Sequence, residues 1–538
     1  MNKLIPNFKS ISIFLSVVQF CLGEHIVFLH TCASYSHRVS QWPLAMSLAE
    51  KGHNVTFISP YGPSSELSSP KVTEIQPQDL KAFMNKIIEQ NFDVNHRAYG
   101  LVPPLFMVID YFCYSACHEM YKSEEIKAWI ASNPQVDLVV ADTMADCSYG
   151  LAHKFDAKTI LYQPIPVVTK HFESFGINAE TESLPDYDVS KPTPLTFFSR
   201  VAGAMLPLWY RVIEPIFHQK YKSLFSEELG LTNLPDVHDM RELTSLMIIN
   251  GDYLSDYPRS FPPFVVKVPG IHLKKTGEHK PLKKEIEDFI HAKDEIGGNK
   301  TEGFIYISFG TVAKAPNLPI ELREIFLKTI KSFPHRFIWK WEGGKIPEEY
   351  PSNLLFVEWV DQQDVLAHPK IKAFLTQAGR PSFQEALGNG VPTITFPVLA
   401  DQDFNAHRMR DLGISIGLDF VGLTQEKLTE AISRLLTDDS YKKRSVQLAK
   451  LSKDVPMDPV DTALWWTEFV LRHTKEELEL LKPLSRHLTW YQKRGFDVWL
   501  FLFGFLSLST WMTYVILCRI YASFFGNNNF SSIKLKKS

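Results

Sequence analysis

The chain has 538 residues, of which 45% are hydrophobic and 22% are charged. This length exceeds one ordinary domain and the composition is globular, so we expect two soluble domains with appendages. The formal net charge of −3 gives no reason to expect a nucleic-acid partner.

Residues 1–23 have the order of a secretory signal peptide. Lys3 and Lys9 precede the apolar run Ile11–Leu22, and the small Gly23 stands before the charged Glu24. This pattern is typical of a leader that is cleaved after Gly23. A buried first helix is the alternative, but a strand pattern begins directly afterwards. We therefore expect the rest of the chain to enter the secretory pathway.

Residues 24–273 predict a first α/β domain. Glu24–Leu29 and Asn54–Ser59 have strand patterns, and the helix pattern Val39–Lys51 between them is closed by Gly52. Val136–Ala141 has the pattern of a further buried strand. These segments predict an open, mostly parallel sheet with helices on its faces.

Two polar residues follow the carboxyl ends of these strands. His37 lies in a polar loop after the first strand, and Asp142 directly follows Val136–Ala141. Ligands of open α/β sheets bind at this edge. A histidine removes protons near neutral pH, and a carboxylate can orient its ring. A lone loop histidine is more often structural, so His37 and Asp142 are candidate catalytic residues only as a pair.

The segment Pro192–Phe217 is apolar and aromatic but is interrupted by prolines and charges. It is too short between charges to span a bilayer. A wall of a ligand pocket, a segment dipping into a membrane interface and ordinary core packing all remain open.

A charged stretch, residues 274–302, contains Gly297-Gly298 and predicts an interdomain linker. A second α/β domain over residues 303–435 follows it. Its strand patterns are Phe304–Phe309, Arg336–Trp341, Leu354–Trp359, Ala373–Thr376 and Thr393–Phe396.

The end of the chain predicts a membrane anchor. Helices are expected over residues 436–495, and residues 496–518 include the uncharged run Val498–Cys518, which is long enough to cross a bilayer. Behind a signal peptide, one late span predicts a single-pass type I protein. The cytosolic tail, residues 519–538, ends in KLKKS, whose lysines resemble a dilysine retrieval signal of the endoplasmic reticulum. A basic tail lying on anionic headgroups is the alternative.

The cysteines and sequons fit a lumenal protein. The compartment permits disulfides among Cys32, Cys113, Cys117 and Cys147, but their pairing stays open. Of three sequons, the one at Asn299 lies in the polar linker and is the plausible glycosylation site. No His/Cys spacing predicts a metal site.

A run of about fifty residues in the second domain carries a long motif. Its elements are Trp359-x-x-Gln362, His368-Pro369, Thr376-x-x-Gly379, Ser382-x-x-Glu385, Gly390-Val391-Pro392 and Asp401-Gln402 with Asn405. This spacing resembles the signature of the UDP-glycosyltransferases, the animal UDP-glucuronosyltransferase family, in its invertebrate type. The likeness extends from the signal peptide to the dilysine tail.

The resemblance implies a GT-B fold, in which two Rossmann-like domains face each other across a cleft. The C-terminal domain would bind the UDP-sugar and the N-terminal domain the acceptor. Roles carry over to matching residues. Trp359 would stack on uracil beside Gln362, Glu385 would bind the ribose, and Asp401 and Gln402 would hold the sugar. Ser308, Thr311 and Gln377 would face the phosphates, and Gly379 and Ser382 would belong to the same UDP-sugar site.

The resemblance also implies inverting, metal-independent transfer, with no cofactor beyond the UDP-sugar co-substrate. His37 would be the base and Asp142 its partner. The implied substrates are small lipophilic acceptors with a hydroxyl or another nucleophile, as in detoxification. A homo- or hetero-oligomer is a further expectation. The alternatives are a catalytically weak UDP-sugar-binding member that acts as a partner of active enzymes, and a lectin-like module.

Three departures from the family pattern concern the donor. Ile249 stands where glucuronate-using relatives carry an arginine before Asn250, which favours UDP-glucose over UDP-glucuronate. Gln377 replaces the usual histidine at the pyrophosphate, and Pro381 lacks an N–H group. We expect Arg380 to compensate in part by offering its guanidinium to the phosphates.

Overall fold

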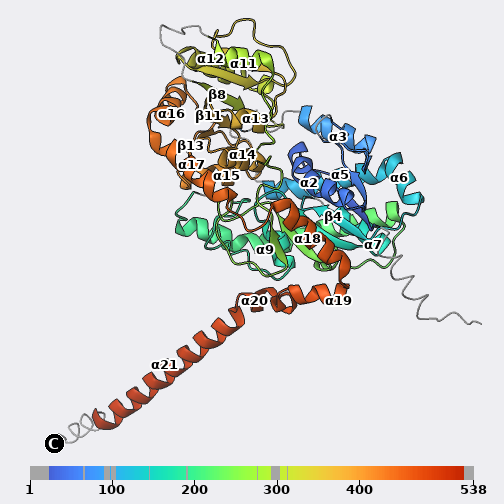
Figure 1. Cartoon of the computed structure of the whole chain (residues 1–538). Coiled ribbons are helices and arrows are strands. Elements are labelled where there is room, and N and C mark those ends of the chain that lie inside the picture. The colour runs from blue at the N-terminus through green and yellow to red at the C-terminus, as the bar shows by residue number, and fades with distance from the viewer. Residues whose placement is uncertain are drawn as a thin grey trace, which may run out of the picture. The chain divides into compact units, whose positions relative to one another are not determined.

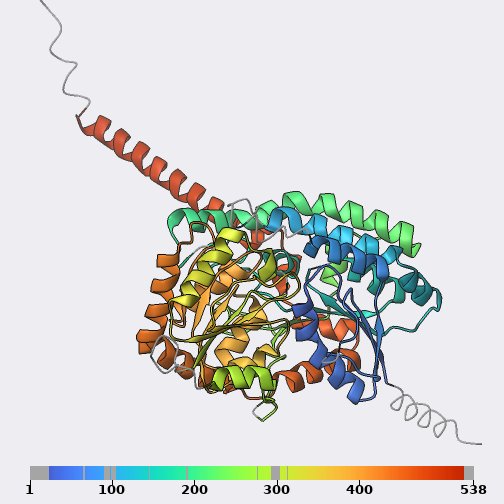
Figure 2. The same cartoon turned by 90° about the horizontal axis from the view of Figure 1, so that it is seen from above.

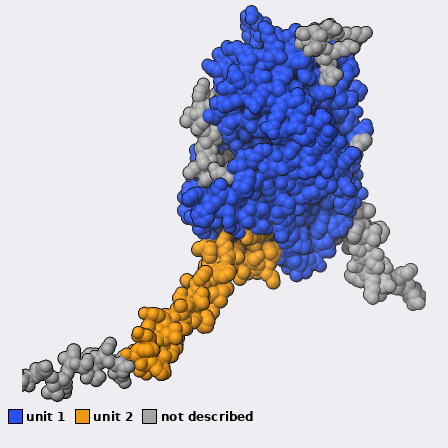
Figure 3. All heavy atoms as spheres, turned by 90° about the vertical axis from the view of Figure 1, so that its left-hand side faces the viewer, with its two compact units in different colours: residues 1–175, 179–482 blue, residues 176–178, 483–538 orange. Residues whose placement is uncertain are grey.

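The computed structural model describes residues 23–64, 67–89, 97, 105–144, 146–189, 192–275, 277–292, 303–311 and 313–525. The predicted signal peptide up to residue 22, the sequon asparagine Asn299 and the terminal lysines lie outside these residues. The chain forms two compact units, one of residues 1–175 with 179–482 and one of residues 176–178 with 483–538 (Figure 3).

The first half of the chain builds a parallel sheet of seven strands in the order β3-β2-β1-β4-β5-β6-β7. The strands are β1 (His25–Leu29), β2 (Asn54–Ile58), β3 (Val72–Ile75), β4 (Leu138–Asp142), β5 (Lys158–Gln163), β6 (Leu246–Ile249) and β7 (Val265–Lys267). The strands β1 and β4 are adjacent, with Leu29 paired to Ala141. The predicted strand at 136–141 therefore exists but is shifted by one to two residues, and Asp142 is its last residue.

The second half builds a parallel sheet of six strands in the order β10-β9-β8-β11-β12-β13. The strands are β8 (Phe304–Ser308), β9 (Arg336–Lys340), β10 (Leu354–Val357), β11 (Ile371–Thr376), β12 (Thr393–Thr395) and β13 (Ser415–Gly417). In the pairing of β8 with β11, Ser308 lies beside Thr376. All five strands predicted for this domain are confirmed, with ends that move by at most two residues.

Helices connect the strands and cover both sheets (Figures 1 and 2). In the first half they are α2 (Tyr35–Glu50), α3 (Gln78–Glu89), α5 (Leu105–Lys122), α6 (Glu124–Ala131), α7 (Cys147–Phe155), α8 (Thr169–Ser174), α9 (Phe197–Leu229) and α10 (Val237–Glu242). In the second half they are α11 (Lys284–His291), η1 (Ala315–Asn317), α12 (Ile320–Lys331), α13 (Gln362–Ala367), α14 (Arg380–Gly388), α15 (Gln402–Asp411), α16 (Gln425–Thr437) and α17 (Asp439–Lys453). The helix α11 lies inside the predicted linker, so that segment is partly ordered and helical.

Both sheets are packed on two faces. Along β1, Val27 and Leu29 join one buried cluster while Ile26 and Phe28 join another. Along β8, Ile305 and Ile307 belong to one buried cluster and Phe304 and Tyr306 to a second. Alternate side chains of a strand point to opposite faces, and parallel sheets are buried on both faces. Two three-layer Rossmann-like halves result, as the sequence predicts.

Strand order fixes where a ligand can bind. In the first sheet the order reverses between β1 and β4, and in the second between β8 and β11. Loops diverge at such a switch point, which leaves a crevice at the carboxyl ends of the two strands. His37 follows β1 and Asp142 ends β4, whereas Ser308 ends β8 and Thr376 ends β11. Each half therefore presents its predicted site residues at its own crevice.

The chain returns to the first half after the second sheet is complete. The helix α18 (Pro459–Arg472) packs against α2, and its Ala463 and Leu464 are buried in the cluster that contains β1. Lys158 Nζ donates to the carbonyl oxygens of Val470 and Leu471, both at 2.9 Å. The predicted segment of C-terminal helices, 436–495, therefore contains helices that belong to the first half's core. The short helices α19 (Lys475–Leu478) and η2 (Glu479–Leu481) follow α18.

The apolar segment that begins at residue 192 is mostly one helix, α9, with Pro207 and Pro215 inside it. One face of α9 is buried in the first half and includes Leu206, Tyr210, Tyr221 and Leu224. The other face exposes large apolar side chains, namely Phe197, Phe198, Val201, Met205, Val212 and Ile216. Core packing thus accounts for one side of the helix only.

Two disulfides join α5 to neighbouring segments of the first half. Cys32, after β1, is bonded to Cys113 of α5, and Cys117 of α5 is bonded to Cys147 at the start of α7. Cys113 and Cys117, one helical turn apart, thus take separate partners. The presence of both bonds fits the oxidising compartment that the predicted signal peptide implies.

The second compact unit contains η3 (Leu484–His487), α20 (Trp490–Lys493) and the 30-residue helix α21 (Phe496–Phe525). Among the described residues α21 is the one helix that is long and apolar enough to cross a membrane, and its most apolar stretch is not buried. The helix begins at the predicted residue 496 and continues seven residues beyond the predicted end at 518. It fits membrane anchoring by length and composition.

Candidate active site

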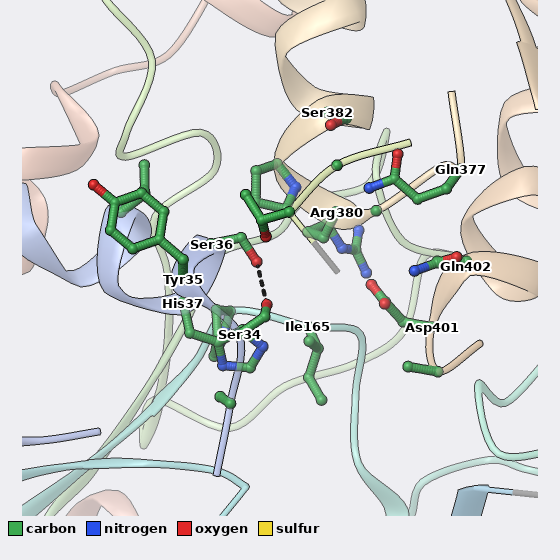
Figure 4. Close-up of a pocket in the computed structure, with 18 of the residues that line it drawn as sticks. Ser34, Tyr35, Ser36, His37, Ile165, Gln377, Arg380, Ser382, Asp401 and Gln402 are labelled. Atoms are coloured by element: carbon green, nitrogen blue, oxygen red, sulfur yellow. Dashed lines mark hydrogen bonds between the residues drawn. The ribbon is translucent and has the colours of Figure 1, made fainter. Parts of the chain in front are cut away.

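A cavity of about 1210 Å³ lies between the two halves of the first compact unit. Every catalytic and donor-binding residue predicted from the sequence lines it except Asp142, which lies behind His37. These lining residues are His37, Ser308, Thr311, Trp359, Gln362, Gln377, Gly379, Arg380, Ser382, Glu385, Asp401 and Gln402. In Figure 4, Ser34 to His37 lie on one side and Gln377, Arg380, Ser382, Asp401 and Gln402 on the other. Residues up to 365 positions apart in the sequence therefore share one cavity.

His37 lies in the first turn of α2, not in a loop as the sequence predicts. The helix begins at Tyr35 because Ser34 is extended at the N-cap, with φ −74° and ψ 166°, and the His37 amide donates to the Ser34 carbonyl at 3.0 Å. The polar composition of residues 34–37 hides this early start. The imidazole Nδ1 lies 2.9 Å from Asp142 Oδ2, and Nε2 is the nitrogen left to accept a proton.

Asp142 is held by three hydrogen bonds. Besides His37, Gln41 Nε2 donates to Oδ2 at 2.7 Å and the Met144 amide donates to Oδ1 at 3.0 Å. Burial alone raises the pKa of Asp142, but the attraction and hydrogen bond of His37, together with the Met144 amide, outweigh it and lower the pKa below its usual value. The carboxylate stays ionised at neutral pH and can stabilise a protonated His37.

Two residues behind His37 were not predicted. Gln41 stands one helical turn after His37, a spacing that places both side chains on the same face of α2. The buried ring of His30 stacks on His37 with centroids 6.1 Å apart. Burial, reinforced by the charges of His37 and Arg38, lowers the pKa of His30 to about 3. His30 is therefore a neutral support for the ring of His37.

The turn after β8 and the residue after β11 meet in the second half. Gly310 has φ +81°, a conformation that favours glycine, and a Cβ there would lie 2.0 Å from Gln377 Nε2. The hydroxyl of Thr376 donates to Gln377 Oε1 at 3.1 Å, which directs the amide nitrogen of Gln377 toward this turn. Gln377 thus offers neutral N–H donors where the family motif places a histidine.

The helix α14 begins at this crevice. Its N-cap is Gly379, Pro381 stands in its first turn, and both residues line the cavity with Ser382. The first N–H groups of a helix have no intrahelical partner and face the positive end of the helix dipole. The missing N–H of Pro381 is at a position that helices tolerate. The sequence and the fold together make this end of α14 an anion-binding position.

The guanidinium of Arg380 is engaged with the other half of the molecule. Nη1 donates to the Ser255 carbonyl at 2.5 Å, and Nη2 donates to Asp256 Oδ1 at 2.7 Å. The Arg380 side chain is 1% exposed and that of Asp256 9%. Contact of Arg380 with phosphate therefore stays a prediction, and in this arrangement both Nη atoms already have partners.

A second group of residues lies where the resemblance places the nucleoside. Gln362 Nε2 donates to Glu385 Oε2 at 2.6 Å and to Ser382 Oγ at 2.9 Å. Trp359 is 39% exposed, and Lys340 Nζ lies 4.3 Å from the centroid of its indole ring. An indole that is partly exposed and a carboxylate that lines the same cavity offer stacking and acceptors for hydroxyl groups.

The sequence prediction missed Lys340 and His272, both of which line the cavity. His272 Nε2 lies 3.6 Å from Glu385 Oε1. Lys340 ends β9, so the rule that ligands gather at carboxyl strand ends would have found it. His272 stands in the loop after β7, where no motif singles it out.

Asp401 and Gln402 stand at the start of α15, after Ala400 in a left-handed conformation with φ +58°. Burial raises the pKa of Asp401, while the charges of Arg380 and His37 and a hydrogen bond from Asn405 act in the opposite direction. Asn405 Nδ2 donates to Asp401 Oδ2 at 2.7 Å. Gln402 Oε1 accepts from the amides of Val398 and Leu399, which orders the preceding loop.

Part of the cavity wall in the first half is apolar and aromatic. It consists of Ile109, Tyr111 and Phe112 of α5 together with Met144, Ile165 and Tyr187. Of the described residues in the predicted wall Ala98–Lys122, four therefore line the cavity: Ile109, Tyr111, Phe112 and Ser115. Among the described residues from 192 to 217 none lines it. The pocket-wall interpretation of that segment is wrong because α9 packs behind other elements of this half.

One group of possible metal ligands occurs among the described residues, formed by Glu287, His291 and His368. Lys370 donates to Nδ1 of both histidines, from Nζ to His291 at 3.0 Å and from its amide to His368 at 3.1 Å. Each Nε2 therefore carries the proton and lies 3.5 Å from Glu287 Oε2. The three residues form a hydrogen-bonded cluster, and none of them lines the cavity.

The fold and the cavity define a two-domain glycosyltransferase of the GT-B type. Among solved structures, the chain resembles the glycotransferase of kitacinnamycin, with a TM-score of 0.54, 17% identity and coverage of 86% of this chain and 100% of that one. It also resembles a UDP-glucosyltransferase from Polygonum tinctorium, with a TM-score of 0.54, 15% identity and coverage of 84% and 99%. These similarities confirm the predicted fold class.

The model of the family "UDP-glucoronosyl and UDP-glucosyl transferase" matches residues 27–529, so the chain belongs to this family. Curated relatives include UDP-glycosyltransferase UGT5 of Dactylopius coccus, 28% identical over 92% of each chain. Human UDP-glucuronosyltransferase 1A6 is 26% identical over 96% of this chain and 95% of its own length. The chain is a UDP-sugar glycosyltransferase, as the signature predicts.

The close approach of Gly310 and Gln377 gives a test of this part of the site. We expect Gly310→Ala to weaken UDP binding by about tenfold or more, because the new methyl group displaces the Gln377 amide and strains the turn. Binding of UDP to the purified full-length chain, measured by calorimetry, checks this.

Gly343→Ala is the matched control for that variant. Gly343 has a similar φ of +71°, but nothing lies within 4 Å of a Cβ there. Gly343→Ala therefore introduces a similar backbone strain, but its new methyl group does not collide with a neighbouring side chain. Equal UDP affinities for the two variants would contradict the role given to Gln377.

Proposed function

We propose that the chain transfers a glucosyl group from UDP-glucose to a hydroxyl group of a small lipophilic acceptor, with inversion at the anomeric carbon and without a metal ion. The observation that carries the proposal is the His37–Asp142 pair, 2.9 Å apart, on the wall opposite Asp401 and Gln402 of one cavity. His37, the proposed base, belongs to the first half. Asp401 and Gln402, the proposed sugar-binding residues, belong to the second half and line the same cavity.

The first half, which we propose binds the acceptor and call the acceptor half, supplies the base. Asp142 fixes the imidazole by accepting from Nδ1, so Nε2 of His37 takes the proton of the acceptor hydroxyl as its oxygen attacks the anomeric carbon. The imidazolium that forms is stabilised by the ionised carboxylate of Asp142. One bond forms between the acceptor oxygen and the anomeric carbon, while the bond to the departing UDP oxygen breaks. A single displacement of this kind inverts the anomeric centre.

The second half, which we propose binds the UDP-sugar donor and call the donor half, stabilises the departing UDP. Ser308, Thr311 and Gln377 provide neutral hydrogen-bond donors, and the N-terminus of α14 adds amide groups and its dipole. These phosphate-facing groups are donors, not a pair of carboxylates that would hold a divalent cation. Metal-independent stabilisation of the leaving group therefore suits their chemistry.

We infer the chemical class of the acceptor from the apolar and aromatic part of the cavity wall in the first half, which also carries His37. Its aliphatic and aromatic side chains favour flat or compact apolar molecules whose one polar group reaches the histidine. A cavity of about 1210 Å³ has room for both substrates at once. Conjugation of lipophilic compounds, as in detoxification, is the reaction that these properties support.

The donor choice rests on charge. Two guanidinium groups line the cavity and both are paired, Arg380 with Asp256 and Arg97 with Asp403 and Asp419. Ile249, at the predicted arginine position, is buried at the end of β6. The carboxylate of a bound glucuronate would thus lie near the carboxyl group of Asp401. Among the described residues that line the cavity, no unpaired guanidinium would be there to pair with it. A neutral hexose avoids that repulsion.

We propose that α21 anchors the chain in a membrane. We place the two catalytic halves in the lumen of the endoplasmic reticulum, with α21 as a single type I span. The disulfides Cys32–Cys113 and Cys117–Cys147 support an oxidising compartment.

We expect Asp142→Asn to lower kcat/KM by about 10²–10⁴-fold with UDP affinity unchanged, because the amide no longer stabilises the imidazolium. Microsomes that express the variant, assayed with UDP-glucose and a panel of phenols, give the turnover. Asp137→Asn is the control, since Asp137 precedes β4 and binds the His25 amide at the other end of the strand. Turnover by Asp142→Asn at the wild-type rate would exclude His37–Asp142 as the acid–base pair. A wild-type chain that binds UDP without turnover would favour the non-catalytic partner role.

We expect kcat/KM for UDP-glucose to exceed that for UDP-glucuronate by at least about tenfold, since an unpaired, partly buried carboxylate costs on the order of 1–3 kcal/mol. Initial rates with both donors and one promiscuous phenol measure the ratio. A preference for UDP-glucuronate would contradict the charge argument.

A further inference from the structure

The contact between Arg380 and Asp256 joins two residues that lie 124 positions apart in the sequence and on opposite halves of the cavity. Both are buried, at 1% and 6% residue exposure. Asp256 stands in the loop after β6, and Arg380 is the first residue of α14. The bond therefore connects the acceptor half directly to the helix end that lies at the proposed phosphate site.

The loop that carries Asp256 fits closely around this carboxylate. Its amide donates to the Asp252 carbonyl at 2.8 Å, and a Cβ on Gly251 would lie 2.3 Å from Asp256 Oδ2. Glycine at position 251 thus allows the carboxylate to lie against the backbone. Asp256 is a fixed point of the first half.

Further contacts between the same loop and the donor half surround the pair. Gln384, one turn after Arg380, donates to Asn250 Oδ1 at 3.1 Å. From α15, Arg408 donates to the carbonyls of Leu254 and Tyr253 at 3.0 and 2.6 Å. Among these contacts the Arg380–Asp256 pair is the ionic one and lies nearest to the cavity, because Arg380 also lines it.

We propose that Arg380 is a positioning residue: through its bonds to Asp256 and Ser255 it sets α14, and with it the bound UDP-sugar, at a fixed distance and angle from His37. Transfer requires the acceptor oxygen held at one half to reach the anomeric carbon held at the other. Misplacement by about 1 Å costs on the order of 10²-fold in rate. A buried guanidinium with two hydrogen bonds is a more rigid link than a lysine at the same place.

This role differs from direct contact with the phosphates in what Asp256 does. If Arg380 were a phosphate ligand, Asp256 would compete for the guanidinium, and its neutralisation would strengthen UDP binding. If Arg380 positions α14, neutralisation of Asp256 loosens the link between the halves. The two roles thus give opposite results for the same substitution.

The test compares Arg380→Met, Arg380→Lys, Asp256→Asn and the double variant Arg380→Met/Asp256→Asn in the full-length chain. We expect kcat to fall about 10–100-fold in Arg380→Met and Asp256→Asn, with the dissociation constant of UDP within about threefold of wild type. Arg380→Lys retains one donor and the charge, so its kcat should lie between those of wild type and Arg380→Met. The double variant should lose no more than the worse single variant, since both changes break one link.

Arg444→Met is the matched control, because Arg444 binds the Leu412 carbonyl and Gln447 within the donor half. It should retain wild-type kcat. The inference rests on the proposed function, and the two fail in different ways. A wild-type chain without turnover overturns the proposed function. Wild-type kcat in Arg380→Met, additive losses in the double variant, or tighter UDP binding by Asp256→Asn overturns the positioning role. UDP binding that remains in each variant shows that the donor half is folded.

Discussion

The carboxyl ends of parallel strands all lie at one edge of a sheet, and the whole active site depends on this constraint. Reversal of strand order between β1 and β4, and again between β8 and β11, opens a crevice in each half. His37 and Asp142 stand at one crevice, and Ser308 and Gln377 at the other. Both crevices belong to one compact unit and share one cavity, and the chain crosses back through α18 to the first sheet.

Charge pairing determines what this cavity can bind. Asp142 keeps its charge because the attraction and hydrogen bond of His37, together with the Met144 amide, outweigh its burial and lower its pKa. Arg380 and Arg97, which line the cavity, are paired with carboxylates of the protein. In the proposed donor site the phosphates would therefore depend on neutral donors and on the end of α14, and the cavity lining offers no unpaired guanidinium among the described residues. This pairing is the ground for the proposed preference for a neutral sugar over one that carries a carboxylate.

The sequence predicts local features of this site well and long-range ones poorly. The signature from Trp359 to Asn405 has fixed spacing, so the residues of the donor half could be named before the fold was known. Gln41 was within reach, since it lies one helical turn after His37. The pair Arg380–Asp256 could not be predicted, because no local sequence pattern joins residues 124 positions apart. The start of α2 at Tyr35 was missed for another reason: serines around a helix start resemble a loop.

We propose that His37 drives a single displacement at the anomeric carbon. The anomeric configuration of the product tests this most directly, because UDP-glucose carries an α-linked phosphate. Proton NMR of the glucoside formed from UDP-glucose and a simple phenol gives the coupling constant of the anomeric proton. We predict the large coupling of a β-glucoside, which reports inversion. The small coupling of an α-glucoside would report retention and contradict the mechanism.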